Sequence, residues 1–312
     1  MRIFLAGATG VIGEQLVPLL VAGSHQVIAS TRKPEKVGRL RAHGAEPVVV
    51  DGLDRDAVMK AVVAAHPDAI VNQMTALASM RSLKHFDDGF AVTNRLRTEG
   101  TSHLLEAARA AGTSKIVVQS YTGWPNERRG GRVKTEDDPL DSNPPKAMTR
   151  SLAAIRALEQ MVTKPDGVTG TALRYGSLYG PGTFLSNQSE TVTMIRQRKF
   201  PLVGNGAGVW SFLHVKDAAR ATQLALERDT PGLYNIVDDD PAEASEWLPY
   251  LAQLVGAKPP YRLPVWLARF VVGGAGVSMM TQIRGSSNAK AKRDLGWQPE
   301  YASWRDGFRR GL

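Results

Sequence analysis

The first 175 residues alternate short apolar runs with longer stretches in which apolar residues recur at helical spacing. The apolar runs, which predict strands, cover residues 2–6, 26–30, 46–50, 69–71, 115–118 and 171–173. The stretches with helical spacing cover residues 14–22, 34–43, 54–65, 89–111 and 152–162. Strands that are apolar throughout are typical of parallel sheets, which helices cover on both faces. The pattern therefore predicts an α/β fold built on a doubly wound parallel sheet.

Three glycines stand directly between the first predicted strand and the first predicted helix. They are spaced GxxGxxG in the stretch GATGVIG. A turn of this kind presents bare backbone N–H groups at a helix N-terminus, where a pyrophosphate can bind. The predicted cofactor contacts in this turn are Gly7, Thr9, Gly10, Val11, Ile12 and Gly13. An ordinary tight turn is the alternative, but a strand before it and a helix after it favour a Rossmann-like, dinucleotide-binding domain.

The second half of the chain has a different character, because Pro and Gly become frequent after about residue 180. Its pattern predicts helices at 191–199, 215–227, 242–255 and 264–280 and a strand at 233–237. We expect residues 1–180 to form the dinucleotide-binding domain and 181–312 a smaller C-terminal α/β substrate lobe, with some elements returning to the first domain. Ligands of open parallel sheets bind beyond the carboxyl ends of the strands, so such a lobe would enclose a small-molecule substrate.

The end of the second predicted strand indicates which nicotinamide cofactor the domain prefers. An acidic residue there would hold the adenosine 2′-hydroxyl and repel a 2′-phosphate. Instead the chain has Thr31, Arg32 and Lys33, with no acid between Gln26 and Pro34. Arg32 could bind a phosphate through two N–H groups, which favours NADP(H) over NAD(H). A solvated basic loop is the alternative interpretation.

Further candidate contacts for the cofactor follow the ends of other predicted strands. These predicted cofactor contacts are Asp51, Gly52, Gln73, Met74, Thr75 and Tyr175. Each position alone could be a plain strand end. Because the carboxyl ends of parallel strands share one edge of a sheet, a single extended ligand explains them together.

Composition narrows the classes of partner. Lys and Arg number 39 against 30 Asp and Glu, which gives a formal net charge of +9 and favours anionic ligands. The charges are scattered, so nucleic acid is not an expected partner. No cysteine is present, which excludes disulfides and thiolate metal sites and suits the cytoplasm. The six histidines have no metal-ligand spacing, and no segment resembles a signal peptide or a membrane span, so neither a metal nor a membrane is expected.

Four segments after the glycine turn resemble motifs of one protein family, and they occur in the order that this family has. They are EGTSHLLEAA at 99–108, LRYGSLYGPG at 173–182, FLHVKDAA at 212–219 and AKAKRDLGWQP at 289–299. Together with GATGVIG they resemble the extended short-chain dehydrogenase/reductase superfamily, in its NAD(P)-dependent epimerase/dehydratase branch. The resemblance covers nearly the whole chain and implies a Rossmann-like fold and a nicotinamide cofactor.

The family's catalytic signature is missing. Its redox members carry YxxxK, in which the Lys lowers the Tyr pKa and holds the ribose so that the phenol can transfer a proton. None of the seven tyrosines of this chain has a Lys four residues later. If Glu159 matches the family's Glu, Ser151 replaces the Tyr and Ile155 replaces the Lys. The resemblance therefore implies an atypical member whose proton donor lies elsewhere.

Tyr121 is the predicted catalytic residue. It follows the fifth strand near the family's Ser/Thr position, between Ser120 and Thr122, which we expect to assist it. An aromatic side chain that merely closes the pocket is an equally good interpretation of Tyr121. Arg97 lies where the family's helix often has Asn.

Other residues have mainly structural interpretations. We expect His214 to be a histidine bonded to backbone, Asp217 to be a helix N-cap, and Arg174 to tie the two lobes together. An apolar pocket could be lined by Phe184, Phe200, Trp210, Phe212 and Trp266. The segment before His214 lacks the Arg with which family members grip a nucleotide sugar, so the predicted substrate is small and rather apolar.

These observations predict an NADP-dependent oxidoreductase that moves hydride between NADPH and a carbonyl or related unsaturated group. A non-catalytic NADP-binding sensor or scaffold is the alternative, because the Tyr and Lys are missing. An epimerase or dehydratase with tightly held NAD is a third hypothesis. A homodimer that forms through the helices at 89–111 and 152–162 is a further hypothesis, because such dimers are common in the family.

Overall fold

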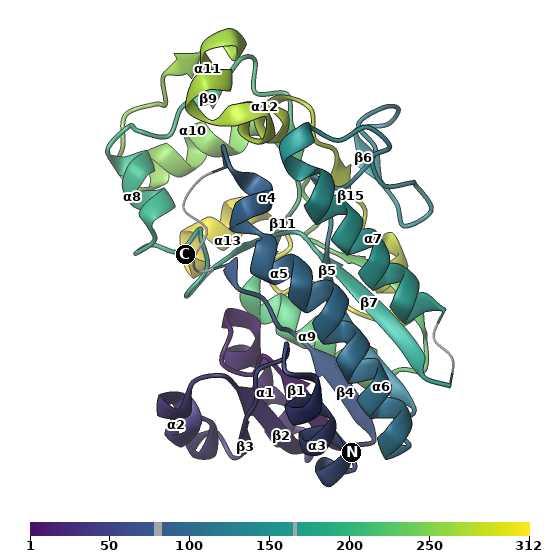
Figure 1. Cartoon of the computed structure of the whole chain (residues 1–312). Helices are drawn as coiled ribbons and strands as arrows, with labels where there is room; N and C mark the ends of the chain where they lie inside the picture. The colour runs from purple at the N-terminus through teal and green to yellow at the C-terminus, as the bar shows by residue number, and fades with distance from the viewer. Residues whose placement is uncertain (78–82, 165–166) are drawn as a thin grey trace.

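A seven-stranded sheet forms the centre of the chain in a computed structural model that describes residues 1–77, 83–164 and 167–312 (Figure 1). The strands are β1 Arg2–Ala6, β2 Gln26–Thr31, β3 Glu46–Val49, β4 Ala69–Asn72, β5 Lys115–Tyr121, β7 Thr169–Tyr175 and β12 Gly232–Ile236. They lie in the order β12-β7-β5-β4-β1-β2-β3, and every pairing is parallel. The predicted doubly wound α/β fold is confirmed, and a strand from the second half completes one edge of the sheet.

Helices cover both faces of the sheet because each strand is apolar on both sides. α1 Val11–Ala22 and α9 Val215–Glu227 cover one face. The helices on the other face are α3 Arg55–Ala65, α6 Thr101–Ala111 and α7 Thr149–Thr163. Along β1, Ile3 and Leu5 point into the first layer, and Phe4 and Ala6 point into the second. This alternation is the period of two that a strand imposes on its side chains.

The direction of winding reverses next to β1. The chain passes from β1 outward through β2 to β3, and then returns to place β4 on the other side of β1. The connections after β1 and β4 therefore leave the sheet in opposite directions, and a crevice forms between them. The glycine turn follows β1 at this point.

The second lobe lies beyond the carboxyl edge of the sheet (Figure 1). Its helices are α8 Glu190–Arg196, α10 Ala244–Leu254, α11 Val265–Val271, α12 Gly273–Thr281 and α13 Trp304–Gly311. Short strand pairs join it to the loops: β8 Ser177–Tyr179 with β11 Phe212–His214, β9 Leu202–Val203 with β14 Arg262–Leu263, β10 Val209–Trp210 with β13 Ala242–Glu243, and β6 Val133–Lys134 with β15 Gly285–Ser286. Four fully buried rings, Phe212, Trp247, Trp304 and Phe308, pack together in its core.

Several predicted helices are divided. The stretch predicted as one helix over 89–111 comprises α4 Phe86–Gly89, α5 Ala91–Arg95, a π-helical segment η3 Leu96–Gly100, and α6. The stretch 34–43 begins as the 3₁₀ turn η1 Pro34–Lys36 and continues as α2 Val37–Ala42. Two further short elements are the 3₁₀ turn η4 Lys146–Met148, which precedes α7, and the π-helical segment η5 Ala291–Leu295, which follows β15. The helix predicted over 264–280 is broken at Gly273, whose φ of +71° interrupts helical geometry.

Two structural predictions were wrong. Arg174 does not tie the lobes together, because both its Nε and Nη2 donate to the Glu159 carboxylate of α7, each at 2.7 Å. Ser120 also donates to this carboxylate at 2.7 Å. Asp217 is not an N-cap, because His214 caps α9. The Asp217 carboxylate instead accepts the backbone N–H groups of residues 300 and 301, so it fixes the C-terminal segment against α9.

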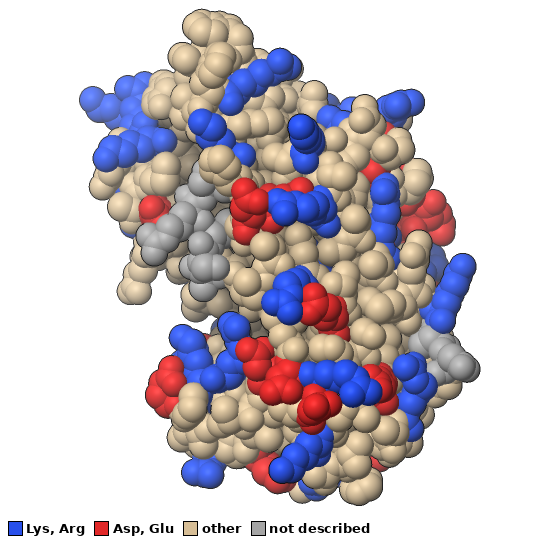
Figure 2. Space-filling view, in the orientation of Figure 1, with Lys and Arg blue, Asp and Glu red and all other residues tan. Residues whose placement is uncertain are grey.

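None of the helices in the described parts of the chain is long and apolar enough to cross a membrane. Lys and Arg side chains are scattered among Asp and Glu over the face seen in Figure 2, rather than gathered in one stripe. A cytoplasmic location and a homodimer stay predictions.

Substitution Glu159→Gln tests the buried ion pair. Glu159 and Arg174 are 5% and 4% exposed, so the change leaves the Arg174 guanidinium buried without a counter-charge. We expect the free energy of unfolding to fall by about 3–5 kcal/mol in urea titrations. The exposed Glu35→Gln is the matched control and should stay within about 0.5 kcal/mol of the parent. An equal effect of the two substitutions would contradict this account.

Candidate functional site

The glycine turn brings two backbones into direct contact. Gly7 has φ +85°, and a Cβ there would lie 2.7 Å from the carbonyl carbon of Gln73 after β4. A Cβ at Gly13 would lie 2.5 Å from the carbonyl oxygen of Ala8, so the first turn of α1 can only pack this closely with glycine. Gly10 is the N-cap of α1 and has no side chain to satisfy the first N–H groups of the helix. The turn therefore offers an anion an uncapped helix N-terminus beside bare backbone.

Hydrogen bonds hold the basic loop after β2 against the glycine turn. The hydroxyls of Thr9 and Thr31 lie 3.1 Å apart, and Thr31 also accepts the backbone N–H of Lys33 at 3.1 Å. Lys36 Nζ donates to the Thr9 carbonyl at 3.2 Å. The Arg32 side chain is exposed, and no hydrogen bond or ion pair engages it within the described residues. The Arg32 guanidinium is therefore free to bind a ligand next to the uncapped N-terminus of α1.

Gly52 and Met74 are packed into one another after β3 and β4. A Cβ at Gly52 would lie 2.3 Å from the Met74 sulfur, so a side chain there would displace the end of Met74. The neighbouring Asp51 is exposed and accepts the Leu53 backbone N–H at 3.0 Å. Met74 and Thr75 are half-buried on the next connection. The predicted contacts at these two strand ends therefore lie side by side at the carboxyl edge.

Gln73 and Tyr175 form a buried network behind this edge. Gln73 Nε2 donates to the Tyr175 hydroxyl at 3.0 Å, and that hydroxyl lies 2.6 Å from the Thr222 hydroxyl of α9. Burial raises the pKa of Tyr175 to about 12, so its phenol stays neutral. The Gln73 Oε1 atom is buried and has no hydrogen-bond partner in the described structure. The two side chains connect β4, β7 and α9, and the Gln73 backbone faces the glycine turn.

This donor set fits a nicotinamide dinucleotide. The uncapped α1 N-terminus would hold the pyrophosphate, Arg32 would lie near the adenosine ribose, and the backbone after β4 would pass the cofactor. The loop after β8 would cover it, because a Cβ at Gly182 would lie 3.2 Å from Val11 Cγ1 in the first turn of α1. The bound nicotinamide would supply hydride.

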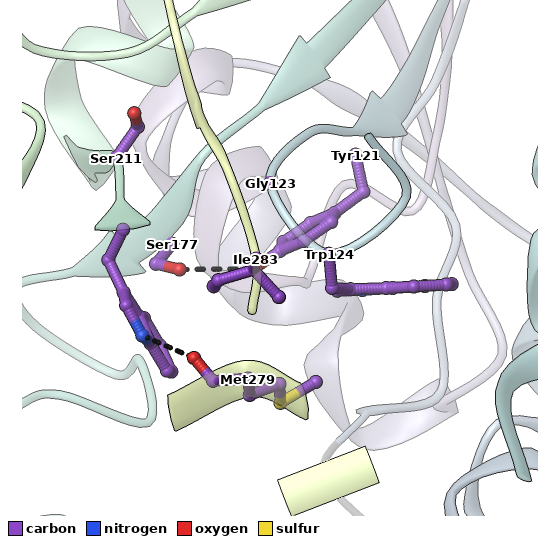
Figure 3. A pocket seen from close by; sticks show the side chains of 8 residues that line it. Tyr121, Gly123, Trp124, Ser177, Ser211, Met279 and Ile283 are labelled. Atoms are coloured by element: carbon purple, nitrogen blue, oxygen red, sulfur yellow. Dashed lines mark hydrogen bonds between the residues drawn. The ribbon is translucent and has the colours of Figure 1, made fainter. Parts of the chain in front are cut away.

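A narrow pocket lies beyond the carboxyl end of β5, between the two lobes (Figure 3). It is lined by Tyr121, Gly123, Trp124, Ser177, Trp210, Ser211, Met279 and Ile283. The Tyr121 and Ser177 hydroxyls lie 3.0 Å apart, and the Tyr121 ring stacks near Trp124 with a centroid distance of 6.2 Å. Burial raises the pKa of Tyr121, against opposing effects of Ser177 and the Arg97 guanidinium. The pocket thus offers two hydroxyls on a largely aromatic and apolar wall.

The structure separates the three predicted catalytic residues. Tyr121 lines the pocket, whereas Ser120 is buried and bonded to Glu159. Thr122 is also buried, and its hydroxyl lies 2.6 Å from that of Ser286 in β15. Ser177 occupies the place by Tyr121 that these neighbours were expected to take. The pairing of β5 with β7 sets Tyr121 opposite Tyr175, so this register could have pointed to Ser177.

The positions of the missing Tyr and Lys are occupied by structural side chains. Ser151 donates to the Asp87 carboxylate at 2.6 Å and accepts from Asn94 Nδ2 at 3.1 Å. Ile155 is fully buried in the core that continues into the second lobe. Neither position provides a phenol or a cation.

The predicted apolar lining was only partly right. Trp210 lines the pocket, and its Nε1 donates to the Met279 carbonyl at 2.9 Å. Phe212 is buried in the lobe core. Phe184 and Trp266 are 46% and 67% exposed, and neither lines this pocket. Trp124, Met279 and Ile283 take their place, and sequence analysis missed all three. Met279 lies on α12 and Ile283 just after it, so only the folded chain brings them to the loop after β5 that holds Trp124.

A glycine turn at the switch point of a parallel sheet, facing a second lobe, defines a dinucleotide-binding α/β protein. Comparison with known proteins specifies the family. A model of the NAD dependent epimerase/dehydratase family matches residues 3–237, and the chain belongs to this family. The resemblance that its motifs indicated is thereby confirmed.

One curated relative matches the chain along its full length. It is a 3-diazoavenalumate denitrifying reductase from a Streptomyces species, 44% identical over 312 residues, which covers 99% of this chain and 100% of the relative. Among solved structures, a double mutant of the dTDP-glucose 4,6-dehydratase DesIV from Streptomyces venezuelae, with NAD and DAU bound, has a TM-score of 0.78 and 22% identity over 100% of this chain and 95% of that one. The human epimerase family protein SDR39U1, with NADPH, has a TM-score of 0.73 and 20% identity over 99% and 97% of the two chains. Both structures support the fold.

His214 is structural, as expected. Its Nδ1 accepts the Lys216 backbone N–H at 3.3 Å, and its Nε2 donates to the Gly311 carbonyl at 3.3 Å. The bond to Nδ1 requires the neutral ring, because a protonated Nδ1 cannot accept. Burial lowers the pKa of His214 to about 4, from a usual value of 6.5.

The His214 pKa predicts a pH dependence of stability. Since the unfolded chain binds this proton more readily, the folded state loses stability as the pH falls from about 6.5 towards 4, by up to about 3 kcal/mol. In His214→Asn, which keeps a capping side chain, this loss should disappear from urea unfolding measured between pH 7 and 4.5. The exposed His66→Asn should retain it. An unchanged pH slope in His214→Asn would contradict the assignment.

Proposed function

We propose that the chain is an NADPH-dependent reductase that replaces a diazo group of a small, rather apolar molecule by hydrogen. Its family and its 44% identical relative, named a denitrifying reductase, support an oxidoreductase of the extended short-chain type. The observation that carries the finer proposal is the loss of the proton-transfer pair, with Ser151 and Ile155 built into structural contacts.

Diazo replacement explains why the pair can be lost. Reduction of a carbonyl adds hydride to carbon and a proton to oxygen, so it needs a proton donor. Replacement of a diazonium group by hydrogen forms one C–H bond from hydride and breaks one C–N bond, and N₂ leaves with the bonding electron pair. No proton is consumed. The aromatic wall of the pocket, with Tyr121, Trp124 and Trp210, suits a planar apolar substrate.

Carbonyl reduction is the second candidate, because two hydroxyls face each other in the pocket. The Tyr121 and Ser177 oxygens are 3.0 Å apart, and either residue could bond a carbonyl oxygen. In this case Tyr121 would donate the proton, as its position after β5 predicts. A binding protein that senses NADP without turnover, and an NAD-dependent epimerase, are the remaining hypotheses.

Tyr121→Phe distinguishes the two reductions. We expect NADPH-dependent N₂ release from 2-diazophenolate, above the rate without protein, to stay within about tenfold of the parent, because no proton is required. Reduction of a carbonyl substrate would fall by about 10²–10⁴-fold. The exposed Tyr261→Phe is the matched control. If the parent chain released no N₂ and reduced a ketone panel, diazo replacement would be rejected. NADPH binding without any turnover would favour the sensor.

Cofactor preference is proposed to depend on Arg32. Its free guanidinium stands next to the uncapped N-terminus of α1, and no acid adjoins it on β2. We expect Arg32→Ala to weaken NADPH binding about tenfold in a fluorescence titration, and to leave NADH binding unchanged, because only NADPH carries the 2′-phosphate. Arg109→Ala, an exposed change on α6, serves as control. Equal weakening for both cofactors would exclude a 2′-phosphate contact.

A further inference from the structure

A buried arginine without a carboxylate partner in the described residues is linked through Asn94 to Ser151, the position of the missing Tyr. Arg97 belongs to the π-helical segment η3 and is only 8% exposed. Its Nη1 donates to Asn94 Oδ1 at 3.3 Å, and its guanidinium lies 5.6 Å from the centre of the Phe90 ring. No Asp or Glu in the described ranges forms an ion pair with it. Buried cations are normally paired, so this arrangement requires a reason.

The nearby acids are already committed. Glu159 is bonded to Arg174 and Ser120, and Asp87 is bonded to Ser151. Neither can neutralise Arg97 without leaving another buried group unpaired. Among the described residues Arg97 therefore has no carboxylate at ion-pair distance, and Glu159 acts on it only at longer range.

The orientation of Arg97 is fixed from α7. Ser151 accepts from Asn94 Nδ2, and this bond turns the Asn94 carbonyl oxygen towards Arg97. The charge of the Arg97 guanidinium also acts to lower the pKa of Tyr121, against the larger effect of burial. Burial lowers the pKa of Arg97 itself to about 10, so the side chain remains a cation at neutral pH. A fixed positive group thus stands within electrostatic reach of Tyr121, which lines the pocket.

We propose that Arg97 binds an oxyanion of the substrate, a phenolate or carboxylate on a small aromatic molecule, through its unused N–H groups near Tyr121. The inference rests on the proposed function and specifies its substrate class. A diazonium group is a cation, and a second cation in this low-dielectric site would be repelled by Arg97. A substrate that also carries an oxyanion is neutral overall and supplies the missing counter-charge. Arg97 would therefore select zwitterionic over purely cationic diazo compounds.

Benzoate and benzamide test the site, because they share a shape and differ in charge. By titration calorimetry, the parent chain should bind benzoate about 10- to 100-fold more tightly than benzamide. Arg97→Gln should abolish this preference. Arg95→Gln, an exposed residue of the neighbouring turn that pairs with Glu99, should preserve it. Equal binding of both probes by the parent, or an unchanged preference in Arg97→Gln, would overturn the proposal.

A second variant covers the case in which Arg97→Gln does not fold. Asn94→Asp places a carboxylate where Arg97 already donates, so it should neutralise the guanidinium and reduce the preference for benzoate at least about tenfold. A retained preference would overturn the proposal. These binding measurements are independent of N₂ release. A chain that prefers benzoate but releases no N₂ from 2-diazophenolate would keep the oxyanion site and reject the diazo reaction.

Discussion

The contact between two backbones, after β1 and after β4, governs the carboxyl edge of the sheet. Gly7 can approach Gln73 only because it has no Cβ and takes a positive φ. This approach places the start of α1 directly at the point where the winding reverses. The Gln73 side chain meanwhile turns back to Tyr175 and Thr222, so the edge presents backbone rather than side chains near the turn. An extended anionic cofactor needs this bare surface, and one side chain at Gly7 would remove it.

The loss of the proton-transfer pair belongs to a wider rearrangement. Ser151 has become the centre of a hydrogen-bond chain from Asp87 to Asn94, and Asn94 in turn orients Arg97. Ile155 is packed in the core, where a lysine would be buried among apolar side chains. Restoring the Tyr and Lys by two substitutions would therefore break contacts that stabilise the fold. α7 thus has no cation at this position, whereas the π-helical segment carries the buried Arg97.

The sequence predicted elements well where one local signal sufficed. Apolar runs and a glycine turn located β1 to β5, β7 and the nucleotide edge, since strand burial and turn geometry are short-range properties. It failed where the answer depended on a distant partner. Arg174 needed Glu159, and Asp217 needed the C-terminal backbone. The register of β5 against β7 decided that Ser177, rather than Ser120, meets Tyr121. The break at Gly273 lies inside an apolar run, which gave no local signal for it. The glycine depends on a distant partner, because a Cβ there would lie 2.9 Å from the Lys84 backbone of another loop.

The electrostatics of the pocket link the lost pair to the proposed substrate. A phenol that serves as proton donor works best with a pKa near the working pH, but burial raises the pKa of Tyr121. Arg97 opposes this shift only in part, so the pair is poorly tuned for acid catalysis. A fixed cation beside a neutral phenol is instead suited to holding an oxyanion, with the cation supplying charge and the phenol a hydrogen bond. When dinitrogen leaves a zwitterionic substrate, the product retains the oxyanion and the Arg97 contact persists. The chain would then need no group that changes protonation during turnover, which is the condition under which Ser151 and Ile155 can take structural roles.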